Sequence, residues 1–65
     1  MYRVRTHSID EYGKHYYDME EFYELNNARR FATLDDVVEC TIVQIIEGSD
    51  MVRCIASSVA EAWRA

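Results

Sequence analysis

The stretch Glu39–Ser57, with the sequence ECTIVQIIEGSDMVRCIAS, decides the fold. Two apolar segments rich in Val and Ile flank the pair Gly48-Ser49, and β-branched side chains fill most of Thr41–Ile46. Such side chains favour a strand over a helix because they are stiff at χ1. Glycine tolerates the positive φ that a two-residue type II′ loop requires. We therefore predict a hairpin with strands at about residues 39–47 and 51–57.

The register of this hairpin predicts which of its residues lie in the core. A two-residue loop at Gly48-Ser49 places Ile42 opposite Ile55 and Ile45 opposite Val52. Both faces of the hairpin are then largely apolar. We expect Ile42, Ile45 and Ile55 to lie in the core or in the interface of a dimer.

A mostly α-helical fold is the alternative for this half of the chain. In that interpretation Gly48 ends a helix over residues 34–47, and Asp50 caps a second helix. The apolar residues of the second helix would follow a period of about 3.6; they are Val52, Ile55, Val59, Ala62 and Trp63. In both interpretations residues 58–65 form a short C-terminal helix that packs Trp63 against the core.

A first hairpin is predicted at the N-terminus, with strands at about residues 2–9 and 14–22 around a two-residue loop, Tyr12-Gly13. This loop places side chains of opposite charge across from each other, and such pairs add about 0.2–1 kcal/mol each. The pairs are Glu11 with Lys14, His7 with Asp18, and Arg5 with Glu20. The other face, which we expect to be the core side, pairs Tyr2 with Tyr23, Thr6 with Met19, and Ser8 with Tyr17.

A short helix at about residues 25–32 is predicted between the two hairpins. The competing interpretation is a longer helix over residues 19–32, because Asp18 and Glu21 have the spacing of a capping box. The tyrosine-rich run before this segment and two adjacent Asn residues within it favour the shorter helix. The chain is thus predicted to be one α+β domain, residues 1–65, with a small antiparallel sheet made of two hairpins.

The composition is typical of a small folded protein. The chain has 65 residues, of which 49% are apolar, and no proline, so we expect a folded domain of marginal stability. It lacks a run of about 20 apolar residues that could span a bilayer, and no apolar signal core follows the first residues. We expect a cytoplasmic protein in which Cys40 and Cys54 stay reduced.

Few residues could carry catalysis or hold a cofactor. The chain contains only two glycines, which excludes a glycine-rich phosphate-binding loop. Both cysteines are expected in apolar strands, where a thiol is an inert hydrophobic group. His7 and His15 are expected beside carboxylates in the first hairpin, without a recognised metal-ligand spacing. The sequence therefore predicts no enzyme, no bound metal and no cofactor.

The acidic, tyrosine-rich first third of the chain is the predicted partner-binding region. The net charge is −5, which disfavours phosphate backbones and favours a protein partner with a basic surface. Tyrosine is enriched in interfaces because its rigid ring contributes contact area at a low entropic cost. An acidic stripe that only keeps the protein soluble is the alternative. The predicted binding residues are Tyr16, Asp18, Glu20, Glu21, Tyr23 and Glu24.

The order of the elements resembles that of a known group of proteins. The helix segment FYELNNARRFAT is followed by the strand-rich segment VVECTIVQIIEGSDMVRCIAS, within about Glu21–Ser57. In this pattern the chain resembles small phage-encoded α+β inhibitors, among them one group of type I-F anti-CRISPR proteins and a short phage inhibitor of host RNA polymerase. The resemblance implies an acidic, non-enzymatic inhibitor that blocks a nucleic-acid-handling host complex by occupying a basic surface.

Two other functions are open at this stage. The first is a structural or regulatory homodimer whose apolar sheet faces pair with each other. The second is direct nucleic-acid binding through the arginines Arg3, Arg5, Arg29 and Arg30. The negative net charge disfavours the second of these functions.

Overall fold

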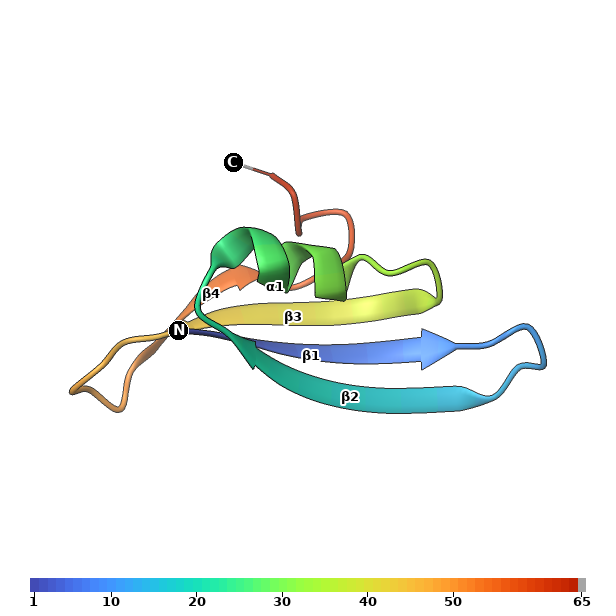
Figure 1. Ribbon diagram of the computed structural model, residues 1–65, viewed down its shortest axis with the longest axis horizontal. Coiled ribbons are helices and arrows are strands. Elements are labelled where there is room, and N and C mark those ends of the chain that lie inside the picture. Colours follow the sequence, from blue (N-terminus) through green and yellow to red (C-terminus); the bar gives the residue numbers. More distant parts are fainter. Residues whose placement is uncertain (65) are drawn as a thin grey trace.

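The computed structural model of the chain describes residues 1–64 and consists of a four-stranded antiparallel sheet with one α-helix on one face (Figure 1). The strand order is β2-β1-β3-β4, so β1 and β3 are central and β2 and β4 form the edges. The elements are β1 (Tyr2–Ile9), β2 (His15–Phe22), α1 (Leu25–Ala32), β3 (Val37–Ile45) and β4 (Val52–Ala56). The predicted antiparallel sheet is confirmed, one short helix lies between the two hairpins, and the mostly α-helical alternative is wrong.

The core lies between α1 and the two central strands. Val4 of β1 and Ile42 of β3 lie opposite each other and are the largest fully buried side chains. The helix contributes Ala28 and Ala32, both fully buried, and these small residues allow the helix to lie close to the sheet. Because α1 has only 8 residues, it is about 12 Å long, whereas β1, also of 8 residues, extends over about 27 Å. The helix therefore covers only one end of its face of the sheet.

The first hairpin is closed by a loop one residue longer than predicted. The Asp10 N–H donates to the Lys14 carbonyl and the Gly13 N–H donates to the Asp10 carbonyl, both at 3.0 Å. Gly13 has a φ of 79°, as expected for the residue that follows a type I turn in a three-residue hairpin loop. The Asp10 carboxylate accepts hydrogen bonds from the N–H groups of Tyr12 and Lys14, both at 2.9 Å. This side chain favours the longer loop over the predicted one.

The longer loop shifts the register of β1 and β2 by one residue, so the three predicted charge pairs are wrong. The shift moves each expected partner to the opposite face of the sheet. The predicted core face is correct for β1, where Thr6 is buried on the side of α1, but wrong for β2, where Met19 and Tyr17 are exposed on the other side. The observed pairs include Tyr2 with Phe22, Arg3 with Glu21, Arg5 with Met19, Thr6 with Asp18, and His7 with Tyr17.

The second hairpin has the predicted register near its loop and departs from it further along. Gln44 pairs with Arg53, as predicted, but a register shift between Ile42 and Val43 places Ile42 opposite Ala56 instead of Ile55. Ile42 is buried as expected, whereas Ile45 and Ile55 are half-buried.

The loop of this hairpin is also longer than predicted and occupies residues 46–51. The Ser49 N–H donates to the Ile46 carbonyl at 3.2 Å. Gly48, with a φ of 78°, is therefore the third residue of its turn, where a type II turn requires a positive φ. The predicted type II′ turn is wrong, although glycine is needed for the same reason.

A series of turns follows β4 in place of the predicted C-terminal helix. Their backbone hydrogen bonds have the i→i+3 spacing of tight turns. The N–H groups of Glu61, Ala62 and Arg64 donate to the carbonyls of Ser58, Val59 and Glu61, respectively, at 3.1–3.2 Å. Ala62 is fully buried, whereas Trp63 is 51% exposed. Ala62 rather than Trp63 is thus the residue packed into the core, and residue 65 lies outside the described part of the chain.

Candidate partner-binding surface

The edge strand β2 carries half of the predicted binding residues in one row. All of its residues except Phe22 are exposed. Phe22 packs against Phe31 of α1, with ring centroids 5.5 Å apart. Because side chains alternate along a strand, Tyr16, Asp18 and Glu20 point to the same side of the sheet as Phe22. We call these three residues the acidic row.

The other predicted residues lie outside the acidic row. Glu21 points to the opposite face, where its Oε2 accepts a hydrogen bond from Arg3 Nη2 at 3.2 Å. Tyr23 and Glu24 lie in the link between β2 and α1, and Tyr23 is 84% exposed. The structure therefore places Tyr23 and Glu24 beyond the end of the row and separates Glu21 from it.

Two carboxylates that the sequence analysis missed lie near the acidic row. Asp35 and Asp36 belong to the loop between α1 and β3, and the Asp36 carbonyl accepts a hydrogen bond from the Ile9 N–H at 3.0 Å. A groove of about 510 Å³ separates this loop from β2; it is lined by Ser8, Tyr16, Asp18, Leu34, Asp35 and Asp36. The position of the loop depends on the pairing of β3 with β1, which local sequence patterns do not specify.

Tyr16 is oriented by the loop of the first hairpin. Its hydroxyl donates to Asp10 Oδ2 at 3.2 Å, and Lys14 Nζ lies 5.3 Å from its ring centroid, within the range of a cation–π contact. Desolvation raises the pKa of Tyr16, and the hydrogen bond to the charged Asp10 raises it further. The pKa of Asp10 is lowered, mainly by the hydrogen bond from the Lys14 N–H. Desolvation has a smaller effect in the opposite direction, and the hydrogen bonds from the Tyr12 N–H and the Tyr16 hydroxyl lower the pKa further. Tyr16 is thus a neutral, oriented ring beside Asp18.

A stack of rings lies on the face of the sheet opposite α1, which we call the open face. The His7 ring stacks on His15 and on Tyr17, with centroid distances of 4.9 and 4.6 Å. His7 Nε2 lies 2.7 Å from His15 Nδ1, and His7 Nδ1 lies 3.4 Å from Glu39 Oε2. His7 therefore lies near Glu39 and not opposite Asp18, its predicted partner. Within residues 1–64, no group of three or more His, Cys, Asp or Glu side chains is arranged to hold a metal ion.

The rest of the open face mixes apolar and basic side chains. Tyr17, Met19 and Val52 are 75%, 54% and 55% exposed. Arg3 and Arg5 point to the same face from β1. The other two arginines of the predicted nucleic-acid surface, Arg29 and Arg30, belong to α1 on the opposite side. The four arginines therefore do not form one basic patch.

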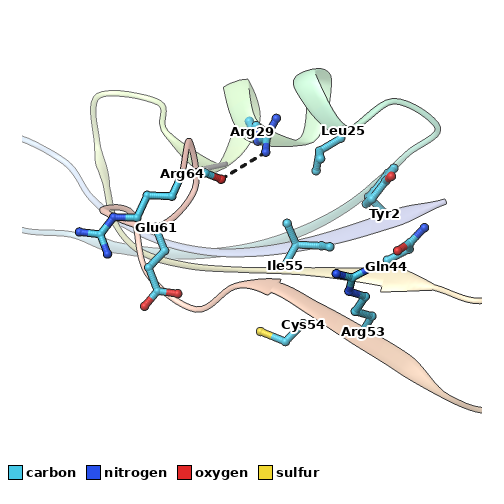
Figure 2. Close-up of a pocket in the computed structure, with 9 residues that line it drawn as sticks. All are labelled: Tyr2, Leu25, Arg29, Gln44, Arg53, Cys54, Ile55, Glu61 and Arg64. Atoms are coloured by element: carbon cyan, nitrogen blue, oxygen red, sulfur yellow. Dashed lines mark hydrogen bonds between the residues drawn. The ribbon is translucent and has the colours of Figure 1, made fainter.

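A second groove, of about 640 Å³, lies between α1, the C-terminal turns and β4 (Figure 2). Leu25 and Ile55 face each other across it, and Arg29 reaches from the helix toward the carbonyl of Arg64, at 3.5 Å. Arg29 Nε also donates to the Ala62 carbonyl at 2.9 Å, so this side chain holds the C-terminal turns in place. The groove is lined by Tyr2, Leu25, Arg29, Gln44, Arg53, Cys54, Ile55, Glu61 and Arg64. Three of the seven basic side chains of the protein thus lie here, near the edge of the sheet farthest from β2.

Comparisons with known proteins identify no relative of this chain: no protein family, curated protein or solved structure matches it. In the part of the chain that the structure describes, no helix has the length and apolar character needed to cross a membrane.

Proposed function

We propose that this chain is a small, acidic, non-enzymatic protein that binds a protein partner with a basic surface through β2 and the segments beside it. The observation that carries the proposal is the acidic row, in which Asp18 and Glu20 stand beside the oriented ring of Tyr16 on an exposed edge strand. Asp35 and Asp36 add negative charge on the same side. Carboxylates accelerate the encounter with a basic surface, and a tyrosine ring supplies an anchor that slows dissociation.

The resemblance to phage inhibitors implies a more specific role, in which the protein inhibits a host complex that handles nucleic acid. Such a complex holds nucleic acid in a basic groove, and a carboxylate surface competes with phosphates for the same Lys and Arg side chains. We expect the competition to weaken as salt rises, because both interactions are electrostatic.

Binding kinetics with a partner recovered by affinity capture test this proposal. The double variant Glu20→Lys/Glu24→Lys should slow association by about tenfold at low salt and flatten its salt dependence. The matched control is Glu47→Lys/Asp50→Lys, which makes the same change of charge in the loop between β3 and β4 and should have a smaller effect.

The aromatic contribution is tested by dissociation rates. Tyr16→Ala should accelerate dissociation, whereas Tyr12→Ala, which removes an exposed ring from the loop of the first hairpin, should leave it nearly unchanged. If neither the charge reversal nor Tyr16→Ala alters binding although both variants are folded, the interface lies elsewhere and the proposal is wrong.

A homodimer is the second candidate function, and the open face favours it. Tyr17, Met19 and Val52 are each more than half exposed there, and the face carries charges of both signs, including Arg5 and Glu39. Sedimentation equilibrium tests this candidate. A dimer that dissociates in the variant Met19→Glu, but not in Met51→Glu at the exposed hairpin loop, would support it.

A further inference from the structure

The two edges of the sheet differ in how well they are protected against pairing with another strand. Natural edge strands are protected by short length, bulges, proline or charged side chains, of which lysine is the most effective. The edge strand β4 has 5 residues, and its pairing with β3 contains a register shift between Cys54 and Ala56. The edge strand β2 has 8 residues, HYYDMEEF, without lysine or proline, and pairs with β1 without a register shift. β2 therefore offers a long, regular edge.

Alternation of the hydrogen bonds identifies which backbone groups of β1 point toward β3. The Ile9 N–H donates to the Asp36 carbonyl, and the Met1 carbonyl accepts from the Ile45 N–H. In an antiparallel ladder the backbone groups of successive residues point to alternate sides of the strand. The odd-numbered residues of β1 therefore bond to β3, and the even-numbered residues bond to β2.

The same alternation identifies the free groups of β2. Even-numbered residues of β1 lie opposite even-numbered residues of β2, for example Thr6 opposite Asp18. The bond from the Asp10 N–H to the Lys14 carbonyl at the loop follows the same rule. The N–H and C=O groups of Tyr17 and Met19 consequently point away from the sheet, toward solvent.

Side chains along this edge define the kind of strand that fits it. On the side of α1, Asp18 and Glu20 present two carboxylates, whereas on the open face Tyr17 and Met19 present apolar surface. Opposite charges across a strand pair are stabilising and like charges are destabilising. An added strand must therefore place Lys or Arg on one face and apolar side chains on the other.

We propose that the free edge of β2 binds an extended segment of the partner protein by β-strand addition. In this segment Lys or Arg residues facing Asp18 and Glu20 alternate with apolar residues facing Tyr17 and Met19. The inference rests on the proposed function and adds to it the mode of binding and the pattern of the partner segment. Main-chain hydrogen bonds supply affinity in this mode, and the alternate side chains supply specificity.

A second copy of the chain fits this edge less well than a basic segment. Antiparallel pairing of two β2 strands centred on Asp18 places the two Asp18 carboxylates opposite each other. Pairing centred on Met19 places Asp18 opposite Glu20 twice. These two registers use most of the strand, and both bring like charges together.

Three synthetic peptides with the length of β2, 8 residues, and alternating Lys and Val test the inference. In the bound strand the valines lie opposite Tyr17 and Met19 and exchange backbone hydrogen bonds with them. The first peptide is unmodified, the second is N-methylated at the valines, and the third is N-methylated at the lysines. The second peptide loses the donors that face β2, whereas the third keeps them and has the same charge and composition.

Amide hydrogen exchange of the full chain is the readout. At about ten times the Kd of the unmodified peptide, exchange of the Tyr17 and Met19 amides should slow by about tenfold. The lysine-methylated peptide should act like the unmodified one, and the valine-methylated peptide should give no protection. Met19→Pro, which removes only an outward N–H, should abolish binding of the unmodified peptide, and Met19→Ala should retain it.

The outcomes separate this inference from the proposed function. Equal protection by the two methylated peptides, or binding of none of the three, would overturn strand addition. In either case a kinetic effect of the Glu20 and Glu24 reversal would still support the proposed function. Concentration-dependent protection of Tyr17 and Met19 without any peptide would assign the edge to a second copy and would also overturn the inference. If Met19→Pro does not fold, the methylated peptides decide.

Discussion

The indole Nε1 of Trp63 donates a hydrogen bond of 3.0 Å to the hydroxyl oxygen of Thr33, the residue that ends α1. The Thr33 hydroxyl in turn donates to the Arg29 carbonyl at 2.7 Å, and Arg29 Nε donates to the Ala62 carbonyl at 2.9 Å. The Arg29 guanidinium also lies 5.6 Å from the Trp63 ring centroid. These contacts tie the C-terminal turns to the end of the helix and keep Ala62 in the core.

The first prediction is that Arg29→Ala loosens the C-terminal turns and destabilises the fold by about 1.5–3 kcal/mol. Hydrogen bonds from charged groups contribute about this much, and the carbonyl of Ala62 loses its donor. Denaturant titration followed by the fluorescence of Trp63, the single tryptophan, measures both effects. The matched control is Arg30→Ala, because the side chain of the exposed Arg30 hydrogen-bonds only to the side chain of Asn27 within the described residues. Equal destabilisation by the two variants would contradict the prediction.

The second prediction concerns the largest fully buried side chain of the sheet. Ile42 is fully buried against α1, and truncation of such a residue to alanine costs about 2–5 kcal/mol. Because small domains have only about 5 kcal/mol or slightly more of stability, Ile42→Ala should lose much of the free energy of unfolding and melt at a markedly lower temperature. Ile42→Val, which removes one methyl group, should cost about 0.5–1.5 kcal/mol and remain measurable by urea titration.

Ile46 provides the control for Ile42. It lies just beyond β3 and is 44% exposed, so Ile46→Ala should change stability by less than about 0.5 kcal/mol. A similar loss of stability in Ile42→Ala and Ile46→Ala would show that the assignment of the two residues to core and surface is wrong.

The second hairpin shows how much of the fold the sequence could predict. β-branched density and Gly48 were sufficient to predict two strands and the pairs near the loop, because both are local properties. The register shift between Ile42 and Val43 was not predictable from them. It places Ala56 opposite Ile42, and Ala56 is buried in the core with residues distant in the sequence, such as Val4 and Ala28.

The first hairpin shows why the candidate surface was predicted only in part. The hydrogen bonds of the Asp10 carboxylate favour a three-residue loop. One extra loop residue shifts the register by one, so each β2 side chain lies on the opposite face of the sheet relative to the side chains of β1. Alternation within β2 does not depend on the loop, so the common face of Tyr16, Asp18 and Glu20 follows from the sequence. The separation of Glu21 from this row follows from the same alternation, whereas its ion pair with Arg3 depends on the register.

The third prediction concerns the two cysteines, which are both free thiols. Cys54 is exposed, whereas Cys40 is 3% exposed. Burial raises the pKa of the Cys40 thiol, and the negative charge of Glu61 raises it further. Since the thiolate is the reactive form, an aromatic disulfide reagent should modify Cys54 rapidly in the native protein and Cys40 only after denaturation. Cys54→Ser should abolish the rapid phase and Cys40→Ser should retain it, and the opposite pattern would contradict the structure.

The last prediction is a pH dependence of stability caused by Asp10. Its pKa is lowered from the usual 3.8, mainly by the hydrogen bond from the Lys14 N–H, so the native state binds a proton at this site less readily than the unfolded state. The ionised carboxylate therefore stabilises the fold above about pH 4, and this contribution disappears as the pH falls through the lowered pKa.

Asp10→Asn keeps an acceptor oxygen but removes the charge, so its stability should be lower than that of the natural chain at neutral pH. Urea titrations from neutral pH into acid should show this difference shrinking below about pH 4, because the other carboxylates titrate equally in both proteins. Glu11→Gln removes a charge from the same exposed loop and serves as the control. If the difference in unfolding free energy between the natural chain and Asp10→Asn stays constant with pH, the charge of Asp10 does not contribute to stability and the prediction is wrong.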